Sequence, residues 1–408
     1  MSIGEVEKQM VFDLMPLLSD KPVVFDVGSN KGNWSDIVMS TNDKCTFHFF
    51  EPNEIMINYT KIKYDYNTNI IYNEVAISDK EGYEDFYYFT NFNNGLSSIL
   101  YNEKWKDLPM QKKLVNSITL DSYCSKNLID SIDILKIDIE GADYKALLGL
   151  EQMLLWSKVK FIQIESSEHY KLDNRTFKDV IEFVGSYGYD VYSYDGIFHK
   201  VEADTFIEDS RLENFIITKE KIANTQNWNT SFIKNTEGLP KVCFALEVGC
   251  FEGMTTKYIC ENMLTEEGHM IAVDPLEDKY IVENITDEAV EINDSLPYFE
   301  GQYTRFLINT NKKPVRLVRK TFTDAFSELE AFRFSFIYID ADHRADSVYL
   351  DAKMAFELLQ TDGYILFDDY EWGNGETKKG IDRFLDEYKD RVDIISINEQ
   401  VLVKYKFR

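Results

Sequence analysis

The sequence has no long hydrophobic run and few cysteines, and both absences limit what the protein can be. No apolar stretch approaches the roughly 20 residues that a helix needs to cross a bilayer. The first residues, 1–8, lack the basic and then apolar build of a signal peptide. The five cysteines are odd in number and form no CxxC pair, which argues against a disulfide framework and a thiolate zinc site. We therefore expect a cytoplasmic protein with reduced cysteines.

Basic residues are scarce as well. The chain has 44 Lys and Arg against 71 Asp and Glu, which gives a formal net charge of −27. Nucleic acids bind non-specifically to Lys and Arg side chains that displace counterions, so this balance makes RNA and DNA poor candidate partners. A local basic groove stays open as an alternative, and the composition does not indicate an oligomeric state.

The length and the hydrophobic pattern predict two α/β domains. A chain of 408 residues with 44% apolar content can bury two cores, at roughly 100–200 residues per domain. Short runs rich in β-branched and aromatic residues alternate with helix-length segments, which is typical of buried parallel strands with crossover helices. We expect domains at 1–218 and 219–408, each with a doubly wound, mostly parallel sheet. The long segments 80–118 and 275–313 are expected to be lids or substrate loops.

Both halves show this alternation of short apolar runs and longer segments. In the first half they lie at 23–26, 46–50, 69–72, 132–137, 159–164 and 214–217. In the second half they lie at 244–246, 270–273, 315–318, 334–339, 364–367, 392–395 and 401–403.

One arrangement of acids and glycines appears twice. The first copy consists of Asp26, the glycine loop 28–32, Glu51, Asp138 and Glu165; the second consists of Glu247, the loop 249–253, Asp274, Asp340 and the pair Asp368-Asp369. The first two acids are 25 and 27 residues apart in the two copies, and the last two are 27 and 28 apart. The middle gap varies, 87 against 66 residues, as insertions would make it. Duplication at this scale indicates two domains of one kind.

Each glycine loop has the features of a nucleoside site. A glycine turn after a strand lets a ligand approach the backbone, and an acid at the end of the next strand can accept hydrogen bonds from ribose hydroxyls. The dinucleotide fingerprint GxGxxG is missing, and an acid before the first glycine favours an ammonium group over a pyrophosphate. Adenosine joined to an amino acid is S-adenosylmethionine, so we expect two such sites; a capped tight turn is the structural alternative for each. The expected cofactor-binding residues are Asp26, Gly28, Asn30, Gly32, Glu51, Glu247, Gly249, Gly253 and Asp274.

Longer motifs resemble known families. Residues 20–200 resemble the FkbM family of S-adenosylmethionine-dependent methyltransferases through FDVGSNKG at 25–32, FEPN at 50–53, GLSS at 95–98, SITLDSYC at 117–124, DILKIDIEGADYKALLG at 133–149 and IQIE at 162–165. Residues 240–405 resemble class I metal-dependent O-methyltransferases through LEVGCFEG at 246–253, VDP at 273–275, IDADH at 339–343 and DGYILFDDYEW at 362–372. The resemblance implies two tandem Rossmann-like domains, each with a seven-stranded sheet and the cofactor at the strand ends.

The second domain carries a candidate metal site. Asp340, Asp368 and Asp369 follow two neighbouring strands, so their carboxylates should meet at one sheet edge, where Mg²⁺ prefers such oxygen ligands. His343 is a candidate general base for a hydroxyl whose pKa the metal lowers. This DxxH with a later DD is similar to macrolide-sugar O-methyltransferases, whereas catechol O-methyltransferase has a lysine at the base position. The structural alternatives are a helix cap for His343 and a turn for the aspartate pair.

The first domain is less specific about its chemistry. Lys136 and Asp138 fall on one face of a strand, and both are candidate catalytic residues. A buried ion-pair network with Glu165 that shapes the cofactor pocket is an equal alternative. A metal in this domain is left open.

Together these features predict a bifunctional O-methyltransferase that acts on hydroxyls of a sugar, a glycan or a glycosylated metabolite. A polyketide, peptide or phenol acceptor is the enzymatic alternative. In another alternative one domain is a degenerate binding module, since a fold does not guarantee activity.

Overall fold

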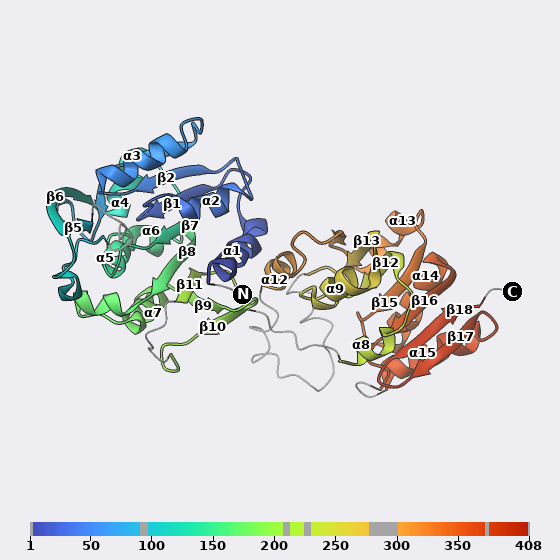
Figure 1. Ribbon diagram of the computed structural model, residues 1–408. Coiled ribbons are helices and arrows are strands. Elements are labelled where there is room, and N and C mark those ends of the chain that lie inside the picture. Colours follow the sequence, from blue (N-terminus) through green and yellow to red (C-terminus); the bar gives the residue numbers. More distant parts are fainter. Residues whose placement is uncertain are drawn as a thin grey trace. The chain divides into compact units, whose positions relative to one another are not determined.

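The computed structural model describes residues 3–89, 97–206, 213–223, 230–276, 301–371 and 375–406. The chain divides into two compact units, Met1–Ala223 and Asn224–Arg408 (Figure 1). The division lies five residues beyond the boundary expected from the sequence, because residues after the last strand still bind the first unit. Lys221 pairs with Asp190 at 2.7 Å, and the carbonyl of Glu220 accepts a hydrogen bond from the Tyr192 hydroxyl.

The first unit is built on an eight-stranded sheet with the order β10-β9-β11-β8-β7-β1-β2-β3. Strand β11 is antiparallel to both β8 and β9, while β1, β2, β3, β7 and β8 pair in parallel. The strands are β1 (Val23–Val27), β2 (Thr46–Phe50), β3 (Ile70–Asn73), β7 (Ile132–Ile137), β8 (Val159–Ser166), β9 (Asp190–Tyr194), β10 (Phe198–Val201) and β11 (Glu213–Thr218).

The expectation of seven strands was wrong for this unit by one edge strand. After β9 the chain turns through Asp195, Gly196 and Ile197, where Gly196 has a positive φ, and returns as the antiparallel strand β10. This hairpin extends the sheet at the edge, beyond the strands that carry the glycine loop.

Helices cover the sheet of the first unit, and its core is a continuous cluster of buried aliphatic and aromatic side chains. The helices are α1 (Ile3–Leu14), α2 (Asn33–Met39), α3 (Glu54–Lys63), α4 (Leu120–Asn127), α5 (Asp143–Leu148), α6 (Glu151–Leu155) and α7 (Phe177–Ser186), with short 3₁₀ turns at Met15–Leu17, Glu103–Trp105 and Glu168–Asp173.

A separate three-stranded sheet takes in the two ends of the segment 80–118, which was expected to be a lid or substrate loop. It has the order β4-β6-β5, with β4 (Ala76–Ile77), β5 (Gly82–Phe89) and β6 (Met110–Ile118). The strands β5 and β6 pair antiparallel along their whole length. Part of this segment and of the GLSS motif, residues 90–96, lies outside the described residues.

The second unit has the expected seven-stranded sheet, with the order β14-β13-β12-β15-β16-β18-β17 and β18 antiparallel to its neighbours. Its strands are β12 (Val242–Val248), β13 (Leu264–Val273), β14 (Val315–Val318), β15 (Phe334–Ile339), β16 (Leu359–Phe367), β17 (Val392–Ile397) and β18 (Val401–Tyr405). Its helices are α8 (Thr230–Thr236), α9 (Met254–Tyr258), the π-helical turn Ile259–Met263, α12 (Gln302–Asn309), α13 (Phe322–Leu329), α14 (Ala345–Leu358) and α15 (Glu376–Tyr388).

The two sheets share one strand order once the hairpin strand β10 is set aside, so the prediction of two Rossmann-like α/β domains is confirmed. In each unit the strand order reverses beside the central strand, β1 or β12, which makes this place the topological switch point of the sheet. Ligands of such folds bind there, at the carboxyl ends of the strands. Of the insertion 275–313, residues 277–300 lie outside the described residues.

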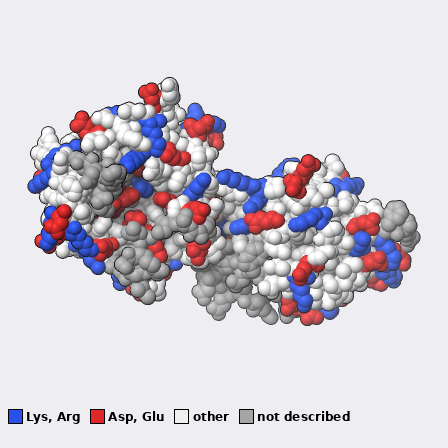
Figure 2. All heavy atoms as spheres, viewed as in Figure 1, with Lys and Arg blue, Asp and Glu red and all other residues white. Residues whose placement is uncertain are grey.

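Charged side chains are spread over both units. Figure 2 shows acidic and basic groups interspersed on the visible face of each. None of the helices in the described ranges is long and apolar enough to span a bilayer.

Candidate functional site

In both units the central strand is followed by a loop whose first position only glycine can occupy. Gly28 and Gly249 have φ angles of +83° and +82°. A Cβ at either position would collide with the backbone carbonyl of Asp138 or Asp340, respectively, at the end of the adjacent strand. The loops therefore lie directly against the carboxyl ends of β7 and β15.

The loops turn in the same way over their next residues. Asn30 and Phe251 both adopt left-handed backbone conformations, with φ of 43° and 45°. Gly32 and Gly253 follow with φ of +72° and +78° and precede helices α2 and α9.

A carboxylate at the end of the second strand binds each loop. Glu51 accepts hydrogen bonds from the N–H groups of Asn30, at 3.0 Å, and Asn53, at 2.8 Å. Asp274 accepts them from Cys250, Phe251 and Leu276, at 2.8–3.0 Å. Burial raises the pKa of Glu51 to about 7 and also raises that of Asp274.

The acid before each glycine loop is buried and only half satisfied. Asp26 accepts a hydrogen bond from the Ser35 hydroxyl at 2.6 Å, and Glu247 accepts one from Thr256, nine residues further along the chain in both cases. The other oxygen of each carboxylate, Asp26 Oδ1 and Glu247 Oε1, is buried without a hydrogen-bond partner. Burial raises the pKa of Asp26, and it raises that of Glu247 to about 8. A cationic ligand group would satisfy both positions.

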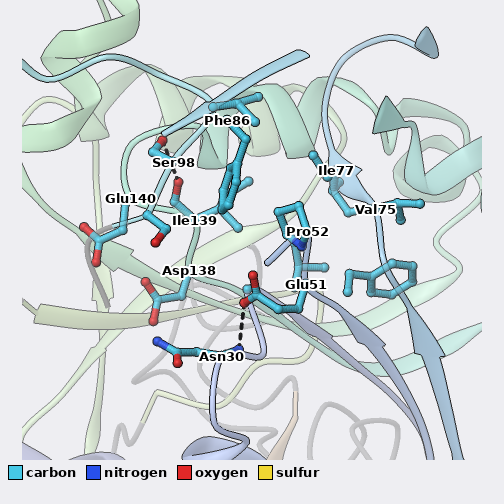
Figure 3. Close-up of a pocket in the computed structure, with 16 residues that line it drawn as sticks. Asn30, Glu51, Pro52, Val75, Ile77, Phe86, Ser98, Asp138, Ile139 and Glu140 are labelled. Carbon is cyan, nitrogen blue, oxygen red and sulfur yellow. Dashed lines mark hydrogen bonds between the residues drawn. The ribbon is translucent and has the colours of Figure 1, made fainter. Parts of the chain in front are cut away.

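A pocket opens over the glycine loop of the first unit (Figure 3). It encloses about 490 Å³ including its open mouth. Polar side chains from the strand ends face apolar ones from the three-stranded sheet, and the Ser98 hydroxyl donates to the Ile139 carbonyl across it at 3.2 Å. The lining includes Gly28, Asn30, Glu51, Pro52, Val75, Ile77, Phe86, Ser98, Asp138, Ile139 and Glu140.

Lys136 and Asp138 lie together beside this pocket, as their alternation in the strand predicts. Lys136 Nζ is 2.7 Å from Asp138 Oδ2, and only 8% of Lys136 is exposed. Burial alone would lower the pKa of Lys136, but the negative charges of Asp138 and Asp26 outweigh it and raise the pKa. Only Asp138 of the pair lines the pocket.

The structure adds a histidine that the sequence alone could not place. His169 Nδ1 lies 2.7 Å from Glu140 Oε2, and this contact is the main cause of the raised pKa of His169. Glu165, on the neighbouring strand, is mostly buried near the same acids. Its pKa is raised to about 8, first by burial and then by the charges of Asp138 and Glu140.

In the second unit, Asp340, His343 and Asp369 come together. One potential ligand atom from each lies within 4.8 Å of the others, and His343 Nε2 is 2.8 Å from Asp369 Oδ2. Burial, followed by the charges of Asp368 and Asp369, raises the pKa of Asp340 well above its ordinary value. Accumulated negative charge of this kind suits a divalent cation, and two carboxylates with an imidazole are suitable ligands.

Asp368 lies beside this group but its oxygens are engaged elsewhere. The Tyr338 hydroxyl donates to Oδ2, while Oδ1 accepts hydrogen bonds from Gln400 Nε2, at 2.9 Å, and from the Asp369 N–H, at 2.8 Å. Gln400 is fully buried and is held in turn by Asn235 at 3.0 Å. Gln400 and Tyr338 are site residues that the sequence reading missed, since only strand pairing brings them to Asp368.

The strand registers show which residues of the two sites correspond to each other. Asp26 pairs across the sheet with Lys136, and Glu247 pairs with Tyr338. Lys136 and Tyr338 therefore occupy corresponding positions, two residues before Asp138 and Asp340. The first site has a built-in ammonium group where the second has a neutral phenol.

Comparisons with known proteins identify two methyltransferase domains. Residues 26–191 match the family described as Methyltransferase FkbM domain, and residues 246–370 match a family described as Methyltransferase domain. The expected FkbM resemblance is confirmed over the first range, and the second range is confirmed as a methyltransferase domain.

Individual relatives are more distant. The chain is 27% identical over 160 residues to a 2-O-methyltransferase NoeI of Sinorhizobium fredii, a match that covers 36% of this chain and 64% of that protein. Among solved structures, an O-methyltransferase from Bacillus cereus in complex with SAH matches with 17% identity and a TM-score of 0.32, covering 45% of this chain and 84% of that one. TomG from Streptomyces achromogenes matches with 13% identity and a TM-score of 0.30, covering 41% and 74%.

The raised pKa of Glu165 predicts a stability change that depends on pH. The pKa of this carboxyl is 4.5 in the unfolded chain and about 8 in the folded one. Ionising it therefore destabilises the folded state as the pH rises from 4.5 through about 8. Glu165→Gln should raise the thermal midpoint of the first unit by about 2–4 °C at pH 9 and leave it nearly unchanged at pH 4.5. Differential scanning calorimetry measures both, with the exposed Glu182→Gln as control. Equal shifts at the two pH values would contradict the assignment.

Proposed function

We propose that this chain, which carries an FkbM methyltransferase domain followed by a second methyltransferase domain, is a bifunctional S-adenosylmethionine-dependent O-methyltransferase. Its acceptors are hydroxyl groups of a sugar, a glycan or a glycosylated metabolite. The observation that carries the proposal is the repeated frame of a half-satisfied buried acid, a left-handed glycine loop and a distal acid. The relative named as a 2-O-methyltransferase supports a hydroxyl as acceptor.

Each frame has carboxylates suited to two parts of the cofactor, the ammonium group of its methionine moiety and its ribose hydroxyls. The free oxygens of Asp26 and Glu247 are suited to the ammonium group of the methionine moiety, since a buried carboxylate without a partner gains from a cation. Glu51 and Asp274 stand where ribose hydroxyls are bound in folds of this type, while they also hold the loop N–H groups.

In the second domain, Asp340 and Asp369 would hold Mg²⁺, with Asp368 kept in place beside them by Tyr338 and Gln400. A bound divalent ion lowers the pKa of a hydroxyl that coordinates it. His343 would then accept the hydroxyl proton on its imidazole, and S-adenosylmethionine held at Glu247 and Asp274 would supply the methyl group. Its contact with Asp369 orients the ring for this role.

The first domain has less need of a divalent ion. Lys136 already places a positive charge 2.7 Å from Asp138, the counterpart of Asp340. The aspartate pair of the second site has no counterpart in the first, because Ser166 follows Glu165 where Asp369 follows Asp368.

Cofactor stoichiometry tests the repeated frame. Calorimetric titration with S-adenosylhomocysteine should give two sites per chain, and Asp26→Asn or Glu247→Gln should each remove one without unfolding the protein. The exposed Asp65→Asn serves as control and should keep both. A wild-type stoichiometry of one would refute bifunctionality.

Metal binding should be confined to the second domain. We expect one Mn²⁺ or Mg²⁺ per chain in equilibrium binding, lost in Asp369→Asn and retained in Asp138→Asn. A chelator should abolish only the transfer by the second domain, and added Mg²⁺ should restore it. Two ions per chain, or full activity in excess chelator, would argue against this assignment.

Replacement of His343 separates a base from a ligand or a structural residue. In His343→Gln, cofactor and metal binding should persist while turnover by the second domain falls by roughly 10²–10⁴-fold, the usual contribution of positioned proton transfer. Loss of the metal would make His343 a ligand instead. Turnover within tenfold of wild type in a folded variant would remove it from the chemistry.

A further inference from the structure

One face of the hairpin formed by β5 and β6 lies toward the pocket, and the other face lies away from it. Phe86, which lines the pocket, stands directly opposite Lys113 in the antiparallel register, and Tyr87 stands opposite Lys112. Because side chains alternate along a strand, Phe86, Tyr88 and Lys113 share the pocket face, whereas Tyr87 and Lys112 share the other.

The pocket face continues outward as an aromatic surface with a cation on it. The rings of Phe86 and Tyr88 lie nearly parallel, with centroids 5.9 Å apart and 9° between their planes. Lys113 Nζ lies 5.6 Å from the centroid of the Tyr88 ring. The positive charge of Lys113 also lowers the pKa of Glu51, against the larger effect of burial, so its field reaches the cofactor side of the pocket.

Lys112 and Lys113 differ in their ion pairing. Lys112 is 2.6 Å from Asp85 and lies over the Tyr87 ring. Lys113 forms no ion pair with any carboxylate in the described part of the chain, although the protein carries a net charge of −27. Its ammonium group therefore remains available to a ligand beside Phe86, in a pocket that Glu51, Asp138 and Glu140 also line.

We propose that the acceptor of the first domain is a sugar that bears a negatively charged group, a phosphate or a carboxylate. The sugar ring lies against the wall formed by Phe86, and Lys113 binds the anion beside it. A lysine ammonium binds such oxyanions as a compact point charge, and an aromatic wall fits the apolar face of a sugar ring. The acidic side chains that line the pocket repel the anion and so direct it to Lys113. This inference rests on the proposed function, because it identifies the acceptor of that reaction.

The test is equilibrium binding to the full chain, measured by ligand-observed NMR with and without S-adenosylhomocysteine. The probes are glucose 1-phosphate, glucuronate and uncharged methyl glucoside. We expect at least one charged sugar to bind more tightly than methyl glucoside, and Lys113→Gln to weaken that binding about tenfold, as expected when a charged hydrogen bond is lost. Lys112→Gln, the matched control on the opposite face, should bind as wild type does. Preference for glucose 1-phosphate identifies a phosphate, and preference for glucuronate identifies a carboxylate.

Equal binding of charged and uncharged sugars, or equal losses in the two lysine variants, would overturn the proposal. An unchanged thermal midpoint of the first unit in Lys113→Gln verifies that this unit is still folded. The measurement does not depend on turnover. Binding of a charged sugar through Lys113 without any methyl transfer would refute the proposed reaction and support the anion site. Methyl transfer to neutral sugars alone would support the proposed reaction and refute the anion site.

Discussion

Both sites depend on a hydrogen bond between the distal acid and the backbone of the glycine loop. The loops adopt left-handed conformations at Asn30 and Phe251, which only a surrounding structure can hold. Glu51 and Asp274 provide that support by accepting the N–H groups of these residues. Since the same loops lie directly on the ends of β7 and β15, the distal acids also set the distance between the cofactor loop and Asp138 or Asp340. A change in either acid would displace the whole strand-end arrangement.

On this shared frame the two units distribute charge in different ways. The first has a lysine beside two of its acids, since Lys136 pairs with Asp26 across the sheet and forms an ion pair with Asp138. The second has Tyr338 at that position and three aspartates at the sheet edge, where burial and then the charges of Asp368 and Asp369 raise the pKa of Asp340 well above its ordinary value. A cation from solution is the natural complement to the second arrangement. Under the proposed function, the pair would be one cofactor frame adapted to two kinds of hydroxyl activation.

The sequence predicted those parts of the fold that are encoded locally. Period, spacing and glycine position were sufficient for the central strands, the two loops and the acids at the strand ends. Long-range pairing was not accessible. The edge strand β10 depends on a turn at Gly196, and the partners of Asp368 come from β15 and from Gln400, which lies 32 residues further on. The pairing of His169 with Glu140, and the division of Lys112 and Lys113 between two faces, emerged only from the folded geometry.

The most direct test of two cofactor frames with one cation site is a crystal structure of the full chain grown with S-adenosylhomocysteine and Mn²⁺, with data collected at the manganese edge. We expect two S-adenosylhomocysteine molecules, one at each glycine loop, and one anomalous peak beside Asp340 and Asp369. An empty loop at Gly28 or Gly249, or a second manganese peak beside Asp138, would contradict this expectation.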